Sequence, residues 1–475
     1  MKKLSNILIL TLLFSLATSA QKTKIAVLKK LDSQSEKYGY IAMQIWNLAE
    51  MGYLEEQSSS LLQETLSNEG FTIKKGVANI PTAFIAEYGS GLPIIAILGE
   101  FDALPGLSQQ AIPEKKSANG DAGHACGHHL FGTASAAAAI SVKQWMQSTK
   151  QKGTIRFYGC PAEEGGGAKV YMARDGLFDD VDIALHWHPS SQNAASAAAA
   201  LANISAKFRF HGVSAHAAGA PEKGRSSLDG VEAMNAMVNM MREHVPQEAR
   251  IHYVITDGGK APNVVPDFAE VYYYSRHNSR DVVRSIFNRI VKAGEGAALG
   301  TGTTMDYEII NGVHELLPNL SLQKLVHDNL SAIGGVTYSE EEKEFAEKIA
   351  LSLGQTKADL DRAVNIQPYK ETAQAYGSTD VGDVSFVVPT VGFGTATWVP
   401  GTSAHSWQAV AAGGTSIGEK GMMVAAKTIT ATVIDLFKNQ ELIVKAKVEF
   451  KNRRGLNFIY KPLLGNRPPA LNYRK

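Results

Sequence analysis

The chain has 475 residues, of which 44% are hydrophobic and 20% are charged, a balance typical of a globular protein with two or three domains. Its formal net charge of +1 excludes a broad electrostatic attraction to nucleic acid or to an acidic membrane surface. No second long apolar run follows the N-terminal one, so we expect no membrane span.

The N-terminus has the three parts of a secretory signal. Lys2 and Lys3 precede an apolar run at 7–16, which is followed by small residues at 17–20. We therefore predict that residues 1–20 are a signal peptide, and that the mature protein is secreted, working in the periplasm.

The next part of the chain predicts an α/β fold. Residues 22–50 and 55–68 show the apolar spacing of helices. A continuous apolar run at 92–98 is typical of a strand that is buried on both faces, and the runs at 154–158 and 182–185 look similar. Because these runs alternate with helices, we expect a layered catalytic domain with a mainly parallel sheet.

A second pattern begins near residue 203. Strands and helices follow in the order βαββαβ, which is typical of a ferredoxin-like unit, at 204–210, 226–243, 250–256, 269–276, 281–293 and 303–310. A further buried strand at 388–393 and a long helix at 413–437 show that the α/β pattern then resumes. We therefore expect a catalytic domain at 21–201 and 313–445, an inserted lid or dimerisation domain at 202–312, and a C-terminal tail at 446–475, whose role the sequence does not indicate.

Residues 123–129, Gly-His-Ala-Cys-Gly-His-His, gather a thiol and three imidazoles. Three interpretations compete: a buried turn rich in histidine, a Cys–His nucleophile pair, and a metal site. Cys126 and His128 are two residues apart, a spacing that does not bring side chains face to face on a helix, which disfavours the pair. A helix predicted at 133–146 places Cys126 near a helix N-terminus, which favours the thiolate that binds metal.

The chain has two cysteines, Cys126 and Cys160. In an oxidising compartment a disulfide between them is expected. A metal site at Cys126 requires a free thiol, so the two interpretations exclude each other.

Carboxylates and imidazoles follow four predicted strands. The side chains at these four strand ends are Glu100 and Asp102, Glu163 and Glu164, His186 and His188, and His405. In open α/β sheets, ligands bind beyond the carboxyl ends of the strands, so we expect these groups to meet and to form a metal site.

The donor set exceeds what one metal ion needs, so two ions with a bridging water fit better. Such a pair can hold a hydroxide at neutral pH and bind the oxygen of a substrate carbonyl. The adjacent carboxylates Glu163 and Glu164 can divide the work, since one can bind metal while the other accepts the proton of the water.

Five motifs resemble a known family. They are DALP at 102–105, ACGH at 125–128, EE at 163–164, VSAHA at 213–217 and NVVP at 263–266. Together they resemble the dinuclear aminoacylase/carboxypeptidase metallopeptidases (metallopeptidase family 20), in the amidohydrolase branch with a cysteine ligand. The resemblance covers residues 22–437.

The resemblance implies a ligand set for two divalent ions, Zn or Mn. Cys126 would bridge the two ions. The terminal ligands would be His128, Glu164 and His405, with either His186 or His188 as the fifth. Two residues depart from the usual pattern of the family: His129 stands where Asp or Asn is usual, and Glu100 stands where Asp is common and receives no role.

The resemblance also implies the remaining roles. Glu163 would be the general base and Asp102 would orient a ligand histidine. His216, on the inserted domain, would reach the active site of a partner subunit and stabilise the oxyanion. Asn263 and Arg276 would bind the carboxylate of the substrate.

The implied function is a metal-dependent amidohydrolase that cleaves the linear amide bond of N-acyl or N-aroyl amino acids with a free carboxylate, such as p-aminobenzoyl-glutamate. The family implies a homodimer, and an A-type partner subunit is a further expectation. Two alternatives stay open: a periplasmic dipeptidase or carboxypeptidase, and a non-catalytic binding protein on the same fold.

Overall fold

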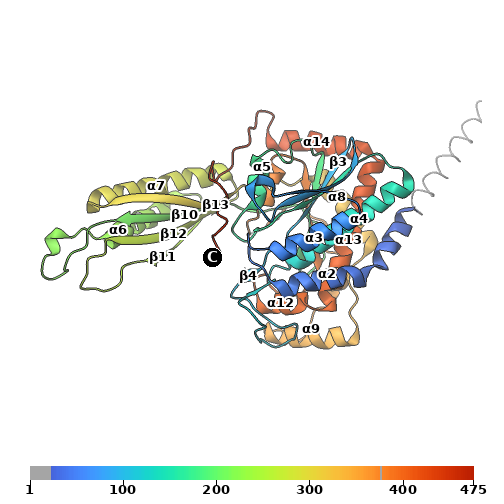
Figure 1. The fold of residues 1–475 in the computed structure, drawn as a ribbon, viewed down its shortest axis with the longest axis horizontal. Coiled ribbons are helices and arrows are strands. Elements are labelled where there is room, and N and C mark those ends of the chain that lie inside the picture. The colour runs from blue at the N-terminus through green and yellow to red at the C-terminus, as the bar shows by residue number, and fades with distance from the viewer. Residues whose placement is uncertain (1–22, 375–376, 475) are drawn as a thin grey trace, which may run out of the picture.

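The computed structural model describes residues 23–374 and 377–474, so the predicted signal peptide lies outside the described residues. Two sheets build two lobes that lie side by side (Figure 1). The larger lobe holds a six-stranded sheet between helices, and the smaller lobe holds a four-stranded sheet with two helices. Within the described residues, no helix combines the length and the apolar character needed to cross a membrane.

The six-stranded sheet has the order β1-β2-β6-β3-β7-β15. Its strands, in that order, are Thr72–Lys75, Phe84–Ser90, Gly153–Gly159, Ile94–Gly99, Ile183–Leu185 and Thr390–Val391. Strands β6, β3, β7 and β15 are parallel, whereas β2 is antiparallel to both of its neighbours. Every residue of β3 is buried, which explains its continuous apolar run. The mainly parallel α/β fold is thus confirmed.

Helices cover both faces of this sheet (Figure 1). On one face, α4 (His128–Thr149) packs against β3 and against α13 (Ser416–Lys438), α2 (Ser35–Leu48) and α3 (Glu56–Asn68). The small side chains of its alanine run allow this close packing, and all its residues from 128 to 143 are buried. The helix expected at 413–437 is α13, which begins three residues later, at Ser416, because Thr415 caps it and the shorter α12 (Trp407–Gly413) ends before it.

The remaining helices complete the lobe. Helix α5 (Ala168–Arg174) packs against α11 (Val381–Ser385), and α8 (Leu320–Ile333) packs against α13 and α14 (Gln440–Arg454). Helix α9 (Glu340–Ser352) begins with a capping box at Ser339 and Glu342.

The four-stranded sheet is antiparallel, with the order β11-β12-β10-β13. Its strands, in that order, are Arg250–Asp257, Phe268–His277, Ala202–His211 and Thr304–Val313. Helices α6 (Ser227–Met241) and α7 (Arg280–Thr301) cover one face and bury the odd-numbered residues of β12. This order is that of a ferredoxin-like unit, as the βαββαβ pattern predicts.

Helix α14 continues past Lys445 to Arg454, so the irregular part of the C-terminal tail begins at Gly455. Residues 455–474 then run between the two lobes, where the C-terminal end of the chain lies (Figure 1).

Candidate metal centre

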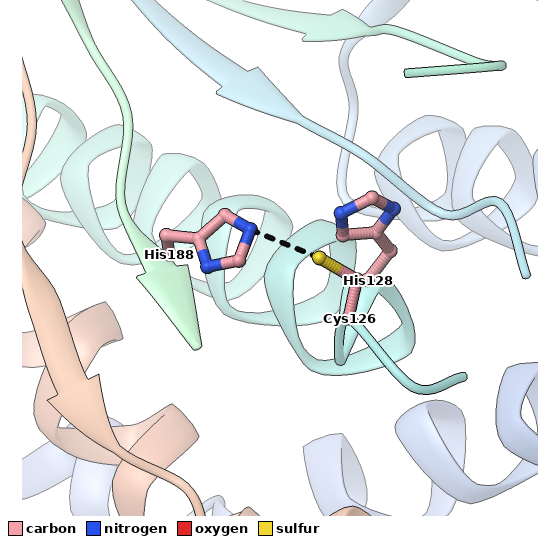
Figure 2. A group of neighbouring side chains, drawn as sticks. All are labelled: Cys126, His128 and His188. Carbon is pink, nitrogen blue, oxygen red and sulfur yellow. Dashed lines mark hydrogen bonds between the residues drawn. The ribbon is translucent and has the colours of Figure 1, made fainter. Parts of the chain in front are cut away.

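Three side chains from two separate segments meet at the N-terminus of α4 (Figure 2). Cys126 and His128 flank Gly127, whose positive φ of 73° turns the chain into the helix. A Cβ atom at Gly127 would lie 2.7 Å from the Cβ atom of Pro189, so the segment that carries His188 approaches the turn closely. The Cys126 Sγ and His188 Nε2 atoms are 3.3 Å apart. One ligand atom from each of the three side chains lies within 4.8 Å of the others.

A second group of ligand atoms shares Cys126 with the first and adds Glu164 and His405. The His405 Nε2 and Glu164 Oε1 atoms are 3.0 Å apart. His405 reaches the turn because its backbone N–H donates to the Ala125 carbonyl at 2.9 Å. Cys126 therefore lies where the two groups join, as expected for a ligand that two ions share.

The carboxylate of Asp102 is hydrogen-bonded to one member of each ligand group. Its Oδ1 accepts a hydrogen bond from His128 Nδ1 at 2.8 Å, and its Oδ2 accepts one from the Glu164 backbone N–H at 2.9 Å. The side chain of Asp102 is fully buried. Its position after β3 thus fixes the orientation of the His128 ring and of the Glu163–Glu164 peptide.

The loop that carries Glu163 has its own support. Glu55, fully buried, accepts a hydrogen bond from the Ala162 backbone N–H at 2.8 Å, and Ala162 has a positive φ of 54°. Burial raises the pKa of Glu163 well above its ordinary range, and the charges of Glu100 and Glu164 raise it further. A carboxylate with a raised pKa is suited to accept a proton near neutral pH.

The sequence analysis did not identify Lys169 and Asp380, two charged residues that lie behind this site. Lys169, on α5, is fully buried, and its Nζ lies 2.7 Å from Glu100 Oε1 and 2.6 Å from Asp380 Oδ1. Glu100, which had no role, also lies 3.2 Å from His128 Nε2. A lysine among the otherwise apolar residues 168–173 was the available signal, since buried lysines need a partner.

The two histidines after β7 differ in position. His188 belongs to a ligand group, whereas His186 belongs to none found among the described residues. His186 packs instead against Gly392, where a Cβ atom would lie 2.1 Å from its Nε2. Burial, followed by the charges of His188 and Lys169, lowers the pKa of His186 to about 3. The structure therefore brings His188, and not His186, to the cysteine.

Both cysteines are free thiols. Cys160 lies in the core, where its Sγ donates to the Tyr158 carbonyl at 3.3 Å. Burial raises the pKa of Cys126, contrary to the expectation from its place before a helix. The bound metal ion itself would therefore supply the charge that stabilises the thiolate.

The donor chemistry fits divalent metal ions. His128 Nε2 and Glu164 Oε1 are buried; they face Glu100 at 3.2 Å and His405 at 3.0 Å, groups that can themselves bind a metal ion, and neither makes a hydrogen bond of suitable geometry within the described residues. Buried polar atoms of this kind need a partner, and a cation is a partner that imidazole, carboxylate and thiolate donors share.

A cavity of about 1100 Å³ opens beside these groups, between the two lobes. The even-numbered face of β12, opposite α6 and α7, provides Tyr272, Tyr274 and Arg276 to its wall. The C-terminal segment provides Arg467, Asn472, Tyr473 and Arg474. The cavity thus has walls from both lobes and from the end of the chain.

His216 and Asn263 lie together at the far end of the four-stranded sheet. His216 pairs with Val264 in an isolated antiparallel bridge, and the Ala217 N–H donates to the Asn263 carbonyl at 3.0 Å. Arg276 lies at the other end of β12, in the cavity. Asn263 and Arg276 of one chain are therefore separated by the length of a ten-residue strand, about 30 Å, and cannot bind one carboxylate together.

The α/β sheet with ligands at its carboxyl edge, combined with an inserted ferredoxin-like domain, defines the class of metal-dependent peptidases and amidohydrolases. Residues 201–299 match the peptidase dimerisation domain. The chain is 40% identical over 469 residues to the B-type subunit of the p-aminobenzoyl-glutamate hydrolase of Escherichia coli, a match that covers 93% of this chain and 97% of that protein. The chain belongs to the dinuclear aminoacylase/carboxypeptidase family of metallopeptidases, M20.

Other relatives agree with this assignment. The mouse Xaa-Arg dipeptidase is 27% identical, with 92% of this chain and 94% of that protein covered. The structure of the aminobenzoyl-glutamate utilization protein of Klebsiella pneumoniae has a TM-score of 0.59 at 17% identity, covering 86% and 97% of the two chains. A Bacillus subtilis dinuclear metal-binding peptidase of the M20 family has a TM-score of 0.58 at 16% identity, covering 86% and 99%. At these identities the two structures show the shared fold.

Proposed function

We propose that this enzyme hydrolyses the amide bond of N-acyl or N-aroyl amino acids with a free carboxylate, with p-aminobenzoyl-glutamate as the first substrate to test. The observation that carries the proposal is the meeting of two ligand groups at Cys126, beside a buried carboxylate and a cavity lined with cations. The similarity to the p-aminobenzoyl-glutamate hydrolase of Escherichia coli supports the choice of substrate.

Five side chains would hold two divalent ions, zinc or manganese, with Cys126 shared between them: Cys126, His128, His188, Glu164 and His405. When bound, such ions lower the pKa of water and polarise a carbonyl oxygen. The set accepts both metals because it mixes sulfur, nitrogen and oxygen donors.

The chain's own residues would move the proton. Glu163 would accept a proton from the attacking water on its carboxylate and would deliver it to the leaving amine nitrogen. Asp102 would keep His128 in one orientation through its Oδ1. Lys169, between Glu100 and Asp380, would compensate the negative charge behind Glu163 and so keep that carboxylate available as a base.

The oxyanion contact of His216 would come from a second copy of the chain, because His216 lies at the far end of the inserted domain. Two features support a homodimer through this domain. Strand β11 is an edge strand, and its Val254 and Ile255 are 55% and 39% exposed. Exposed apolar edges of this kind pair readily with another chain. We also propose that an A-type chain serves as a second subunit. The predicted signal at 1–20 supports a periplasmic location.

The test is hydrolysis of p-aminobenzoyl-glutamate by the purified protein with manganese or zinc, before and after chelation. We expect glutamate release that disappears on chelation and returns with metal. The Glu163→Ala variant should keep its metal content and lose activity by about 10²- to 10⁴-fold. The exposed Glu64→Ala change serves as the control. A Glu163→Ala enzyme that keeps both metals and its full rate would contradict the assigned base.

A dipeptidase is the second candidate, favoured by the similarity to mouse and human Xaa-Arg dipeptidases. The cations that line the cavity oppose a substrate with an arginine side chain, since like charges repel in a confined site. If the enzyme releases arginine from an Xaa-Arg dipeptide faster than it cleaves aroyl-glutamate, the dipeptidase becomes the first candidate function.

A further inference from the structure

The segment 455–474 is anchored to both lobes. On the inserted domain, Arg467 donates to the Ile310 carbonyl at 2.9 Å and pairs with Glu308 at 3.0 Å. On the catalytic lobe, Arg174 donates to the Arg467 carbonyl at 2.7 Å, and Leu464 is 2% exposed. The position of the last described residues is therefore set by contacts on both sides.

These last residues reach the metal centre. The Tyr473 hydroxyl donates to the Glu164 carbonyl at 3.2 Å, and Arg474 Nη2 donates to the same oxygen at 2.6 Å. The Tyr473 ring packs edge-on against Tyr53, with ring centroids 5.5 Å apart. A Cβ atom at position 52 would lie 2.1 Å from the Tyr473 hydroxyl. The position of this tyrosine therefore requires glycine at residue 52.

Five cations line the cavity, and three of them are neutralised by carboxylates. Lys207 and Arg209 lie 3.1 Å and 2.9 Å from the carboxylate of Glu270. Glu308 lies 2.9 Å from Arg209 and 3.0 Å from Arg467. These pairs leave little positive charge at that part of the wall.

The other two cations, Arg276 and Arg474, have no carboxylate partner among the described residues. The Arg276 guanidinium lies over the Tyr274 ring, 5.2 Å from its centroid. The Arg474 guanidinium lies over the Tyr473 ring at 4.8 Å, and its buried Nε makes no hydrogen bond within residues 23–374 and 377–474. Each guanidinium is thus held by a ring and keeps donors for an anion.

The two guanidiniums line the same cavity. Tyr272, Tyr274 and Arg276 alternate along β12 and share its cavity face. The Tyr272 hydroxyl donates to the Tyr274 hydroxyl at 3.3 Å. Arg474 lines the same cavity from the C-terminal segment.

On this geometry, and resting on the proposed amidohydrolase function, we propose that Arg474 is a specificity-determining residue that binds a second carboxylate of the substrate. Arg276 takes the α-carboxylate of the amino acid, and Arg474 takes the carboxylate of its side chain. The enzyme therefore selects N-acyl derivatives of acidic amino acids over those of neutral ones.

The experiment compares kcat/KM for p-aminobenzoyl-glutamate and p-aminobenzoyl-alanine in the full-length metal-loaded enzyme. In Arg474→Gln, we expect the preference for the glutamate substrate to fall on the order of 10- to 100-fold, through KM, as one charge-assisted hydrogen bond is lost. Arg474→Lys should restore part of the preference. Lys461→Gln removes an exposed cation of the same segment and should change nothing.

Binding of the anions glutarate and butyrate, measured by thermal shift, gives a second readout that needs no turnover. Glutarate should stabilise the wild-type protein more than butyrate does, and this difference should vanish in Arg474→Gln. An equal loss of rate on both substrates would overturn the proposal, because Arg474 would then act through the Glu164 carbonyl alone. If the wild type cleaves neither substrate, the proposed function fails, and the glutarate difference still decides the role of Arg474.

Discussion

Replacing Asp102 by asparagine tests how far the metal centre depends on a residue that binds no metal itself. Asp102 accepts two hydrogen bonds, from His128 Nδ1 at 2.8 Å and from the Glu164 N–H at 2.9 Å. An asparagine has one acceptor oxygen, so its NH₂ group must face one of these two donors. One bond is lost, and two donors are brought into conflict in a fully buried place.

The expected magnitude follows from that count. A hydrogen bond to a charged group contributes about 1.5–3 kcal/mol. Since about 1.4 kcal/mol is a factor of ten in an equilibrium constant, the affinity for metal should fall by about 10- to 100-fold. This range agrees with the effect usual for groups that orient metal-binding histidines.

Competition with a chromophoric chelator measures the affinity for metal. The rate of aroyl-glutamate cleavage at saturating metal then shows whether the loss of the bond to the Glu164 N–H also affects catalysis. Asp180→Asn makes the same chemical change at a carboxylate whose side chain is 55% exposed, and it should leave both the metal affinity and the rate unchanged. An Asp102→Asn protein with wild-type metal affinity would refute the argument that this carboxylate orients His128.

Three further predictions concern burial and ligand choice. Lys169→Met leaves two buried carboxylates without their cation, so it should destabilise the protein by about 3–5 kcal/mol and lower the thermal midpoint, whereas Lys343→Met at an exposed pair should change it little. His188→Ala should reduce the metal content from two ions to one per chain, and His186→Ala should keep both, as counted by elemental analysis. Burial raises the pKa of Asp383 to about 7. Because the folded state then binds this proton more tightly than the unfolded chain does, the stabilisation is complete below about pH 4 and is lost as the pH rises through about 7. The thermal midpoint should therefore fall between about pH 5 and about pH 8, and it should fall less in Asp383→Asn.

The sequence predicted the strands that carry the site because burial leaves a local signature. The runs at β3 and β7 are apolar on both faces, and β6 is mostly apolar apart from Thr154 and Arg156. The polar residues that follow these strands meet at one edge by the geometry of parallel strands. The order βαββαβ was equally readable, since the inserted sheet has one covered face and alternating side chains.

The choice between His186 and His188 could not be made from the sequence, although both follow one strand. The rule that residues i and i+2 share a face holds within a continuous strand. Here β7 ends at Leu185, and β8 (His188–Ser190) pairs with β16 (Gly394–Ala396) in a separate two-stranded sheet. The two imidazoles therefore belong to different pieces of backbone, and it is His188 that faces Cys126.

Ion-pair partners that are far apart in the chain could not be predicted from local sequence patterns either. Lys169 and Asp380 are 211 residues apart, and a pattern along the chain does not indicate which buried charge compensates which. The same limit applied to Cys126, for which the helix N-terminus predicted a thiolate. Burial has the larger effect and raises the pKa of the thiol, because a largely buried turn favours the neutral form.

The residues proposed to carry out the reaction and the residues proposed to select the substrate lie on different parts of the chain. The groups that meet at Cys126, with Glu163 beside them, lie on loops and at the first residues of α4 and β8 in the catalytic lobe, and they set the chemistry of an amide. Arg276 and Arg474, the two guanidiniums of the cavity without a carboxylate partner in the described part of the chain, lie on β12 and on the segment 455–474. Arg474 is not itself a proposed metal ligand, and it contacts the metal centre through the Glu164 carbonyl at 2.6 Å, so a change at Arg474 should act mainly on which amino acid is accepted. This separation lets one metal centre act on different acyl-amino acids.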